Sequence, residues 1–244
     1  MWGWELQKGR IRVVSDDRVS DIYNLRFRSQ ANESEIASRE NAWKALYTKA
    51  IQKFIEPDMT VMDLGSGPGY FANQVRAKKV IAVDLDTNNS KYLNGNVDFH
   101  NGYSQNLSFQ ESNTVDLVFS SNLFEHLGSS GTLLETLNEI NRVLKSSDRS
   151  RLVVLMPNIR YVKWDFYNFI DHNLPLNEIS LKEALEISNF EIIESHKKFF
   201  PYSANNLRIR FPTTLIKLYL SLPPKFRPLA KQMFFVAKPL NHKP

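Results

Sequence analysis

The chain has 244 residues, of which 42% are hydrophobic and 12% aromatic, a composition typical of a globular protein. No stretch approaches the roughly 18 consecutive apolar residues that a membrane-spanning helix needs. The absence of cysteine excludes disulfides, thiolate metal sites and cysteine nucleophiles. Residues 1–12 lack the apolar core and cleavage site of a secretory signal, so we expect a cytoplasmic protein.

The formal net charge of +5 is unevenly distributed along the chain. Glu194 is the last acidic residue, and ten Lys or Arg follow it. Such asymmetry favours an anionic partner, which could be a phosphate-bearing substrate, an anionic membrane surface or nucleic acid, although a solvated surface would show the same pattern. Residues 208–231 interleave basic with apolar side chains, which is typical of a peripheral contact with an anionic membrane or of an amphipathic helix packed on the fold.

The hydrophobic periodicity predicts an N-terminal arm at 1–33 and one domain at 34–244, with insertions at about 157–180 and 201–230. Helices are expected at Ser34–Ile55, Tyr70–Ala77, Leu133–Leu144 and Leu181–Ser188. Strands are expected at Thr60–Leu64, Val80–Val83, Val97–His100, Val115–Ser120, Arg151–Met156, Phe190–Phe200 and Gln232–Ala237. This alternation predicts a mostly parallel sheet covered on both faces.

The strongest local signal is the glycine-rich loop that follows the strand at 60–64. Gly65 and Gly67 allow a tight turn and close approach of a nucleotide-like ligand, and the expected helix offers free N–H groups. Tyr70 stands where the dinucleotide fingerprint requires a small residue, which disfavours NAD. Asp84 ends the second strand, nineteen residues after Gly65, where a carboxylate can accept hydrogen bonds from ribose hydroxyls.

The spacing of Asp63, Gly65, Gly67 and Gly69 resembles the Asp-x-Gly-x-Gly-x-Gly motif of class I S-adenosylmethionine-dependent methyltransferases. The chain is most similar to the methyltransferase type 11 and type 12 group, of the kind found in bacterial surface-glycan gene clusters. This likeness covers about residues 40–200, and its further motifs are Ile81–Asp86, Asn101–Ser104, Val115–Leu127 and Asn141–Lys145.

The resemblance implies a Rossmann-like α/β fold with a seven-stranded, mostly parallel sheet in the order 3-2-1-4-5-7-6. Helices would cover both faces, strand 7 would be antiparallel, and an amphipathic insertion would precede the last strand. The implied cofactor is S-adenosyl-L-methionine.

The resemblance also implies how the cofactor is held. Gly65 and Gly67 would approach its methionine portion, Asp84 its ribose and Leu85 its adenine. The family commonly has an acid where this chain has Tyr103 and Ser104, which could substitute for it at the adenine. The expected cofactor-binding residues are Asp63, Gly65, Ser66, Gly67, Gly69, Tyr70, Phe71, Asp84, Leu85, Tyr103, Ser104 and Ser121.

Two histidines are candidate catalytic residues. His126 could act as a general base because its ordinary pKa lies near working pH, and His172 lies in an aromatic segment where this fold places acceptor-binding residues. Each could instead have a structural role. Some O-methyltransferases hold a metal with a pair like Glu125–His126 and a further Glu three residues earlier; Asn122 replaces that Glu, so no metal is expected. The expected acceptor-binding residues are Asn122, Glu125, Arg160, Tyr161 and Asp171.

These observations predict methyl transfer, by direct in-line displacement, to a hydroxyl of a glycan or lipid-linked glycan precursor. One alternative is an RNA methyltransferase acting on ribose or tRNA, which the basic tail permits. Other nucleic-acid chemistry is disfavoured because the chain lacks the cysteine for carbon-5 methylation and has Ser121–Phe124 where base-amine enzymes have Asn/Asp-Pro-Pro-Tyr. A further alternative is a non-catalytic, cofactor-binding scaffold at the membrane surface.

Overall fold

The computed structural model describes residues 33–202 and 212–240. The expected N-terminal arm therefore lies outside the described residues apart from its last position, as do Arg208 and Arg210 of the basic segment. The strands are β1 (Thr60–Leu64), β2 (Lys79–Asp84), β3 (Val97–Asn101), β4 (Leu117–Ser121), β5 (Arg151–Pro157), β6 (Phe190–Pro201) and β7 (Ala230–Pro239). The α-helices are α2 (Glu33–Leu46), α3 (Ser130–Val143), α4 (Ile159–Val162), α5 (Glu178–Ile187) and α6 (Thr213–Ser221).

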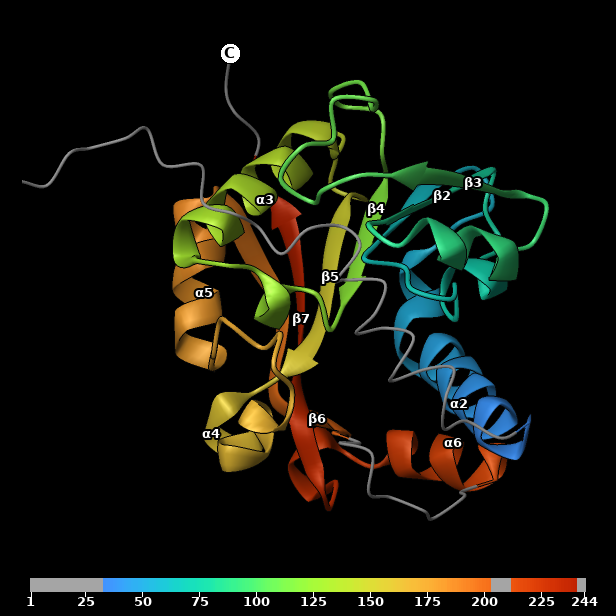
Figure 1. Cartoon of the computed structure of the whole chain (residues 1–244), viewed down its shortest axis with the longest axis vertical. Helices are drawn as coiled ribbons and strands as arrows, with labels where there is room; N and C mark the ends of the chain where they lie inside the picture. Colours follow the sequence, from blue (N-terminus) through green and yellow to red (C-terminus); the bar gives the residue numbers. More distant parts are fainter. Residues whose placement is uncertain (1–32, 203–211, 241–244) are drawn as a thin grey trace, which may run out of the picture.

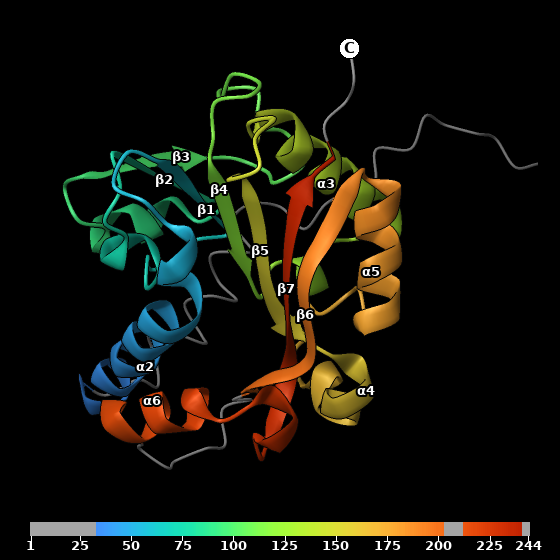
Figure 2. The ribbon, with the colours of Figure 1, turned by 180° about the vertical axis from the view of Figure 1, so that it is seen from behind.

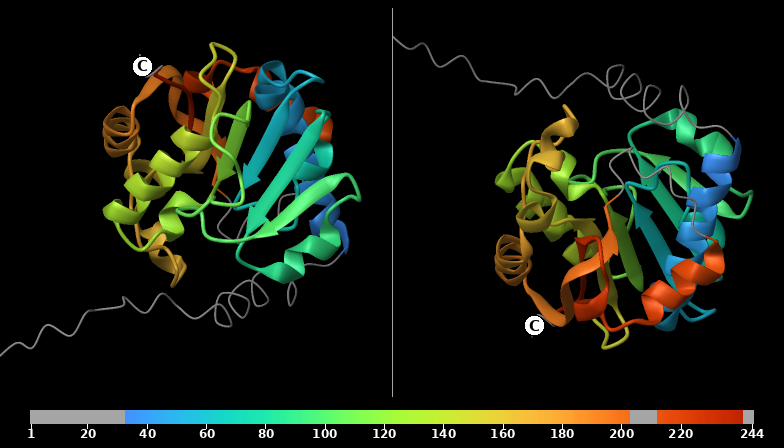
Figure 3. Two further views of the ribbon diagram at one scale, coloured as in Figure 1. Left: turned by 90° about the horizontal axis from the view of Figure 1, so that it is seen from above. Right: turned by 90° about the horizontal axis from the view of Figure 1, so that it is seen from below.

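The seven strands form one sheet in the order β3-β2-β1-β4-β5-β7-β6, as expected. β1 to β5 pair in parallel, and β7 is antiparallel to both β5 and β6. Helices α3 and α5 cover one face, whereas α2 and α6 lie together on the other (Figures 1 and 2). Seen along the sheet edge, the twisted strands separate these two helical layers (Figure 3). The predicted Rossmann-like class is confirmed.

The core follows from the two-residue period of the strands. On β1, Val61 packs with α2 and Met62 with α3, because successive side chains point to opposite faces. Both are fully buried. Continuous apolar runs in β1, β4 and β5 thus supply two cores at once, which is why the sequence shows them as unbroken hydrophobic strands.

The helix expected at Tyr70–Ala77 is wrong: the segment holds only a short 3₁₀ turn, Ala72–Gln74. Fourteen residues, 65–78, connect β1 to β2, and the glycine loop uses the first of them. The Asn73 side chain donates to the Tyr92 carbonyl and accepts from the Asn94 N–H, which ties this segment to the chain before β3. The N–H groups near the loop therefore come from a turn.

The helix expected at Ser34–Ile55 is present but not uniform. After α2 the chain continues through a π-helical turn, Tyr47–Ile51, and a 3₁₀ turn, Gln52–Phe54, and ends before Pro57. The insertion before β7 contains α6, which packs on α2 through the buried Leu220 and exposes Leu218. It is amphipathic, as predicted. None of the described helices is long and apolar enough to cross a membrane.

Leu137 tests how far the core depends on α3. Its side chain is fully buried, so Leu137→Ala should lower the free energy of unfolding by about 2–5 kcal/mol through lost burial and a cavity. Its neighbour Asn138 is exposed, so Asn138→Ala should change that free energy by no more than about 0.5 kcal/mol. Urea denaturation of both variants checks this, and equal losses would contradict the core assignment.

Candidate functional site

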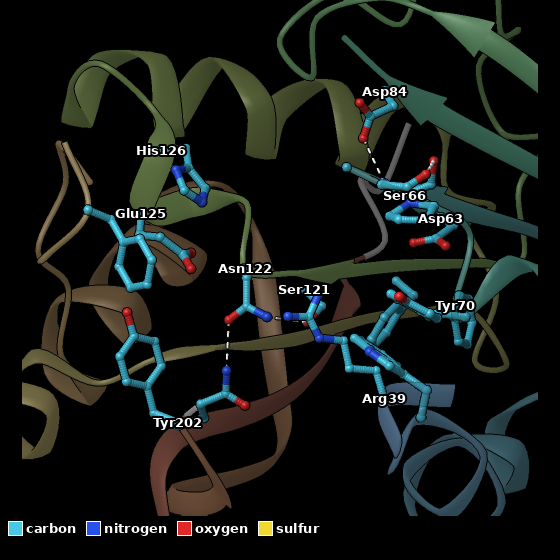
Figure 4. Close-up of a pocket in the computed structure, with 18 of the residues that line it drawn as sticks. Arg39, Asp63, Ser66, Tyr70, Asp84, Ser121, Asn122, Glu125, His126 and Tyr202 are labelled. Carbon is cyan, nitrogen blue, oxygen red and sulfur yellow. Dashed lines mark hydrogen bonds between the residues drawn. The ribbon is translucent and has the colours of Figure 1, made fainter. Parts of the chain in front are cut away.

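A pocket of about 280 Å³ opens at the carboxyl ends of β1, β2 and β4. Parallel strands deliver their following loops to one edge, which is where ligands bind in open α/β sheets. In Figure 4, Asp63, Ser66 and Asp84 lie at one end of the pocket and Glu125, His126 and Tyr202 at the other, with Asn122 between them. The lining residues are Arg39, Trp43, Asp63, Gly65, Ser66, Gly67, Pro68, Tyr70, Phe71, Asp84, Phe119, Ser121, Asn122, Glu125, His126, Phe169, His172, Tyr202 and Gln232.

Gly67 and Gly69 have different roles in the loop. Gly67 has φ +50°, and a Cβ built there would have no atom within 4 Å, so the backbone presents an open face to the pocket. Gly69, with φ +75°, packs so closely that a Cβ would collide with the Leu93 side chain. Gly67 is therefore free to approach a ligand, whereas Gly69 allows the loop to pack on the segment before β3.

Asp84 closes the glycine loop from the end of β2. Its Oδ2 accepts from the Gly67 N–H at 2.7 Å, and its Oδ1 accepts from the Asp86 N–H at 2.9 Å and the Asn89 side chain at 3.1 Å. Burial raises the pKa of Asp84, although these hydrogen bonds oppose the rise. Each carboxylate oxygen has two lone-pair sites, so Oδ2 retains capacity for a ligand hydroxyl.

Asp63, on β1, supports the loop from beneath. Its Oδ2 accepts from the Ala72 N–H at 3.1 Å, which fixes the turn that follows the glycines. Burial raises the pKa of Asp63 to about 8, and the nearby Asp84 charge adds to the rise. Asp63 thus acts as a buried structural acceptor.

Aromatic rings form another part of the pocket lining. Trp43 of α2 stacks on Tyr70 with ring centroids 6.4 Å apart and meets Phe119 of β4 edge-on at 6.1 Å. Arg39, one helical turn before Trp43, brings a guanidinium into the same pocket. Helix α2 therefore supplies one side of the site, which the sequence motifs did not reveal.

The other end is built from two segments far apart in the chain. The 3₁₀ turn η5 (Phe124–His126) follows β4, and the Glu125 carbonyl accepts from the N–H groups of Asn173 and Leu174 at 2.8 and 3.0 Å. These bonds set His172 beside η5, and the His126 and His172 rings meet edge-to-face at 4.8 Å. The two candidate catalytic histidines therefore share one site.

His126 is held by Asp171. Its Nδ1 lies 3.1 Å from the Asp171 carbonyl and 3.1 Å from Asp171 Oδ2, so this nitrogen carries the proton. Burial lowers the pKa of His126, but Asp171 and Glu125 raise it more, and the net result is above the ordinary value. Asp171 thereby orients the ring instead of lining the pocket.

Glu125 is a buried carboxyl group at the same place. Its side chain is 1% exposed, and burial raises its pKa to about 7. Among the residues that the structure describes, none provides a hydrogen bond to Glu125 Oε2. A buried carboxyl group that lines a pocket and has one oxygen without a hydrogen bond is suited to a cationic or hydrogen-bonding ligand.

Comparison with known proteins agrees with this arrangement. Residues 62–149, from β1 through the turn after α3, match the model of a methyltransferase domain family. The fold is that of a class I methyltransferase. An S-adenosylmethionine-dependent methyltransferase from Archaeoglobus fulgidus has a TM-score of 0.59 at 21% identity, covering 90% of this chain and 99% of its own. Another, from Thermotoga maritima, has a TM-score of 0.61 at 16% identity, covering 89% and 98%.

The predicted cofactor is S-adenosylmethionine, for which the similar structures are named, and the residues of the pocket fit it. Gly67 leaves space for close approach, and Asp84 places a carboxylate at the end of β2 for the ribose. Arg39 offers a positive charge for a carboxylate such as that of the methionine portion. The pocket volume lies just below the roughly 300–1,000 Å³ typical of small-molecule sites.

Most of the predicted site residues line the pocket, and some do not. Of the cofactor set, Gly69, Leu85, Tyr103 and Ser104 lie outside it, and the Ser104 hydroxyl bonds to Thr136 at 3.0 Å in the core.

On the acceptor side, Arg160 and Tyr161 are also absent from the lining. Arg160 pairs with Glu178 at 3.1 Å, and Lys198 lies over the Tyr161 ring. Asn122 does line the pocket, with φ +50° and its Oδ1 accepting from Gln232 of β7 at 2.8 Å. The lining residues that sequence reasoning missed are Arg39, Trp43, Pro68, Phe119, Phe169, Tyr202 and Gln232.

The raised pKa of Asp63 predicts a pH-dependent stability. The unfolded chain ionises Asp63 near pH 4, whereas the folded protein keeps it protonated to about pH 8, so its contribution is full at low pH and is lost as the pH rises toward 8. Between pH 5 and 8 the wild type should lose about 1 kcal/mol or more of unfolding free energy relative to Asp63→Asn.

Urea denaturation at three pH values measures this difference. Asp148→Asn, at a side chain that is 90% exposed, is the control and should keep the wild-type slope. A pH-independent offset between wild type and Asp63→Asn would contradict the prediction.

Proposed function

We propose that the protein is an S-adenosylmethionine-dependent methyltransferase that methylates a hydroxyl of a glycan or lipid-linked glycan precursor. The observation that carries the proposal is the two-ended pocket. One end holds the glycine loop and Asp84, and the other holds the cluster of Glu125, His126 and His172. An acceptor at the second end would face a methyl donor at the first.

The residues of the chain act by positioning and by handling a proton. When bound, S-adenosylmethionine supplies a methyl group on a sulfonium sulfur, whose C–S bond breaks toward sulfur as the acceptor oxygen forms the new C–O bond. Such a displacement depends chiefly on alignment, which the fixed walls of the pocket provide. His126 and His172 are the proposed catalytic residues because they line the acceptor end and can assist loss of the hydroxyl proton.

The polar lining of the acceptor end supports a hydroxyl-rich acceptor. Asn122, Tyr202 and Gln232 bring amide and hydroxyl groups beside Glu125, which is the kind of lining that sugars require. Phe169 adds an aromatic face at the same end. Asn122 and Glu125 remain the proposed acceptor-binding residues, with Asp171 positioning His126.

Exposed apolar residues near the acceptor end of the pocket support a lipid-linked form of this acceptor. Trp164 and Ile170 are 83% and 87% exposed on the segment that carries Phe169. Phe226 and Leu229 are exposed beyond α6, and Lys217 of α6 and Lys225 add positive charge. Helices α4 and α6 lie at the same end of the molecule (Figures 1 and 2), so an anionic membrane surface could be approached there. We propose a cytoplasmic protein that contacts the inner face of the membrane peripherally.

Asp84→Ala tests the cofactor end. Hydrogen bonds to charged groups contribute roughly 1.5–3 kcal/mol, so affinity for S-adenosylhomocysteine should fall about 10- to 100-fold. Asp98→Ala removes an exposed acid on the neighbouring strand, which pairs with Lys79 and His100, and should leave affinity unchanged. Isothermal calorimetry compares the variants. Equal affinity for wild type and Asp84→Ala, or no binding to the wild type, would sink the assignment.

Radiolabelled methyl transfer tests the acceptor. The purified protein is incubated with methyl-labelled S-adenosylmethionine and separated polar-lipid, glycan and RNA fractions. Label should appear in the lipid or glycan fraction and be resistant to mild base, as an ether is and an ester is not. Label confined to RNA would overturn the glycan acceptor, and no label in any fraction would overturn the enzymatic proposal.

A further inference from the structure

We infer that Glu125, His126 and His172 form a binding site for a divalent first-row transition-metal ion at the acceptor end of the pocket. Each residue offers one ligand atom, and these atoms all lie within 4.8 Å of one another. All three residues line the same pocket. The role given to the ion rests on the proposed function, whereas its binding does not.

The donor set specifies the class of ion. Two imidazole nitrogens and one carboxylate oxygen suit Mn²⁺, Co²⁺, Fe²⁺ or Zn²⁺, whereas Mg²⁺ and Ca²⁺ prefer oxygen ligands. When an ion is bound tetrahedrally at about 2.1 Å, its ligand atoms lie roughly 3.4 Å apart. Small side-chain rotations would therefore bring the three ligand atoms to this spacing. Three protein ligands leave one or more coordination positions that face the pocket.

The hydrogen bonding of His126 favours a metal ligand over a free imidazole. Because Nδ1 donates to Asp171, the neutral ring carries its lone pair on Nε2. Metal-binding histidines commonly donate their second nitrogen to a carboxylate, which fixes the tautomer and raises the basicity of the ligand nitrogen. Asp171 occupies that supporting position.

Glu125 supplies an independent indication of a cation. Its carboxyl group is buried, and no described residue bonds to its Oε2. Leaving a carboxylate in this state is costly unless an opposite charge binds it. With Asp171 nearby, the cluster combines two carboxyl groups with two imidazoles, and a divalent ion would balance the charge.

The structure also removes the reason for expecting no metal. That expectation rested on Asn122, which stands where related sites have a glutamate. Asn122 Oδ1 is instead engaged by Gln232, and the third ligand comes from His172 on a different segment. The backbone bonds between η5 and residues 173–174 bring this ligand into place.

An ion at this position gives the two histidines a definite role. A hydroxyl oxygen of the acceptor would complete the coordination, and the ion would lower its pKa, as it does for bound water. The hydroxyl proton passes to water, and the oxygen then takes the methyl carbon as described above. The imidazoles thus act by holding the ion.

Metal binding is tested on the full chain after treatment with a chelator. Added Co²⁺ should bind at one equivalent and give the visible absorption of a protein-bound ion. Glu125→Gln and His172→Gln should each weaken Co²⁺ binding by about 10-fold or more, and Asp171→Asn by about 10- to 100-fold with the stoichiometry kept. His100→Gln, at a histidine on β3 that pairs with Asp98, should bind like the wild type.

Further measurements keep the outcomes distinguishable. S-adenosylhomocysteine affinity should be unchanged in His172→Gln, so a folding defect would appear as loss of both ligands. An anomalous scattering map of Co²⁺-soaked crystals locates the ion without any variant. A wild type that binds no Co²⁺, or a peak away from the three side chains, would overturn the metal site and leave the cofactor assignment intact. Metal binding without cofactor binding would overturn the proposed function alone.

Discussion

The structure of the site depends on three buried carboxyl groups at one edge of the sheet. Asp63 lies next to the last residue of β1, Asp84 ends β2 and Glu125 follows β4, and burial raises the pKa of all three. Buried acids are costly, so each must be met by hydrogen-bond donors or by a ligand. Asp63 is met by one backbone N–H and Asp84 by two together with an amide side chain. Glu125 is the least satisfied of the three, because no described residue bonds to its Oε2.

Much of the fold could be predicted because the strands are continuous apolar runs. β1 was expected at its observed bounds, and the order of strands followed from the resemblance. The failure at Tyr70–Ala77 has a physical reason, since periodicity cannot reveal that the Asn73 side chain would bond to residues 92 and 94. Local pattern does not show such contacts with a segment about twenty residues away.

The site could be predicted on the loops that carry motifs and not beyond them. Short motifs contain the glycine loop, Asp84 and the Glu125–His126 pair. Their residue types and spacing therefore made them recognisable in the sequence. Arg39 and Trp43 reach the pocket because α2 docks against β4, whereas Tyr202 follows β6 and Gln232 lies on β7. Ser104 shows the opposite case, because a motif position turned instead toward Thr136 in the core.

Backbone hydrogen bonds between η5 and residues 173–174 build the second end of the pocket. Glu125 takes part twice, since its carbonyl accepts two backbone hydrogen bonds from the later segment while its carboxyl group faces the pocket. The same residue therefore holds the two histidine segments together and brings its carboxyl group to the cluster that they form. Because β4 and β5 hold these loops at adjacent strand ends, the geometry rests on the sheet and not on loop chemistry alone. Substitutions at the cluster should thus affect the acceptor end while leaving the glycine loop, which is anchored to β1 and β2, in place.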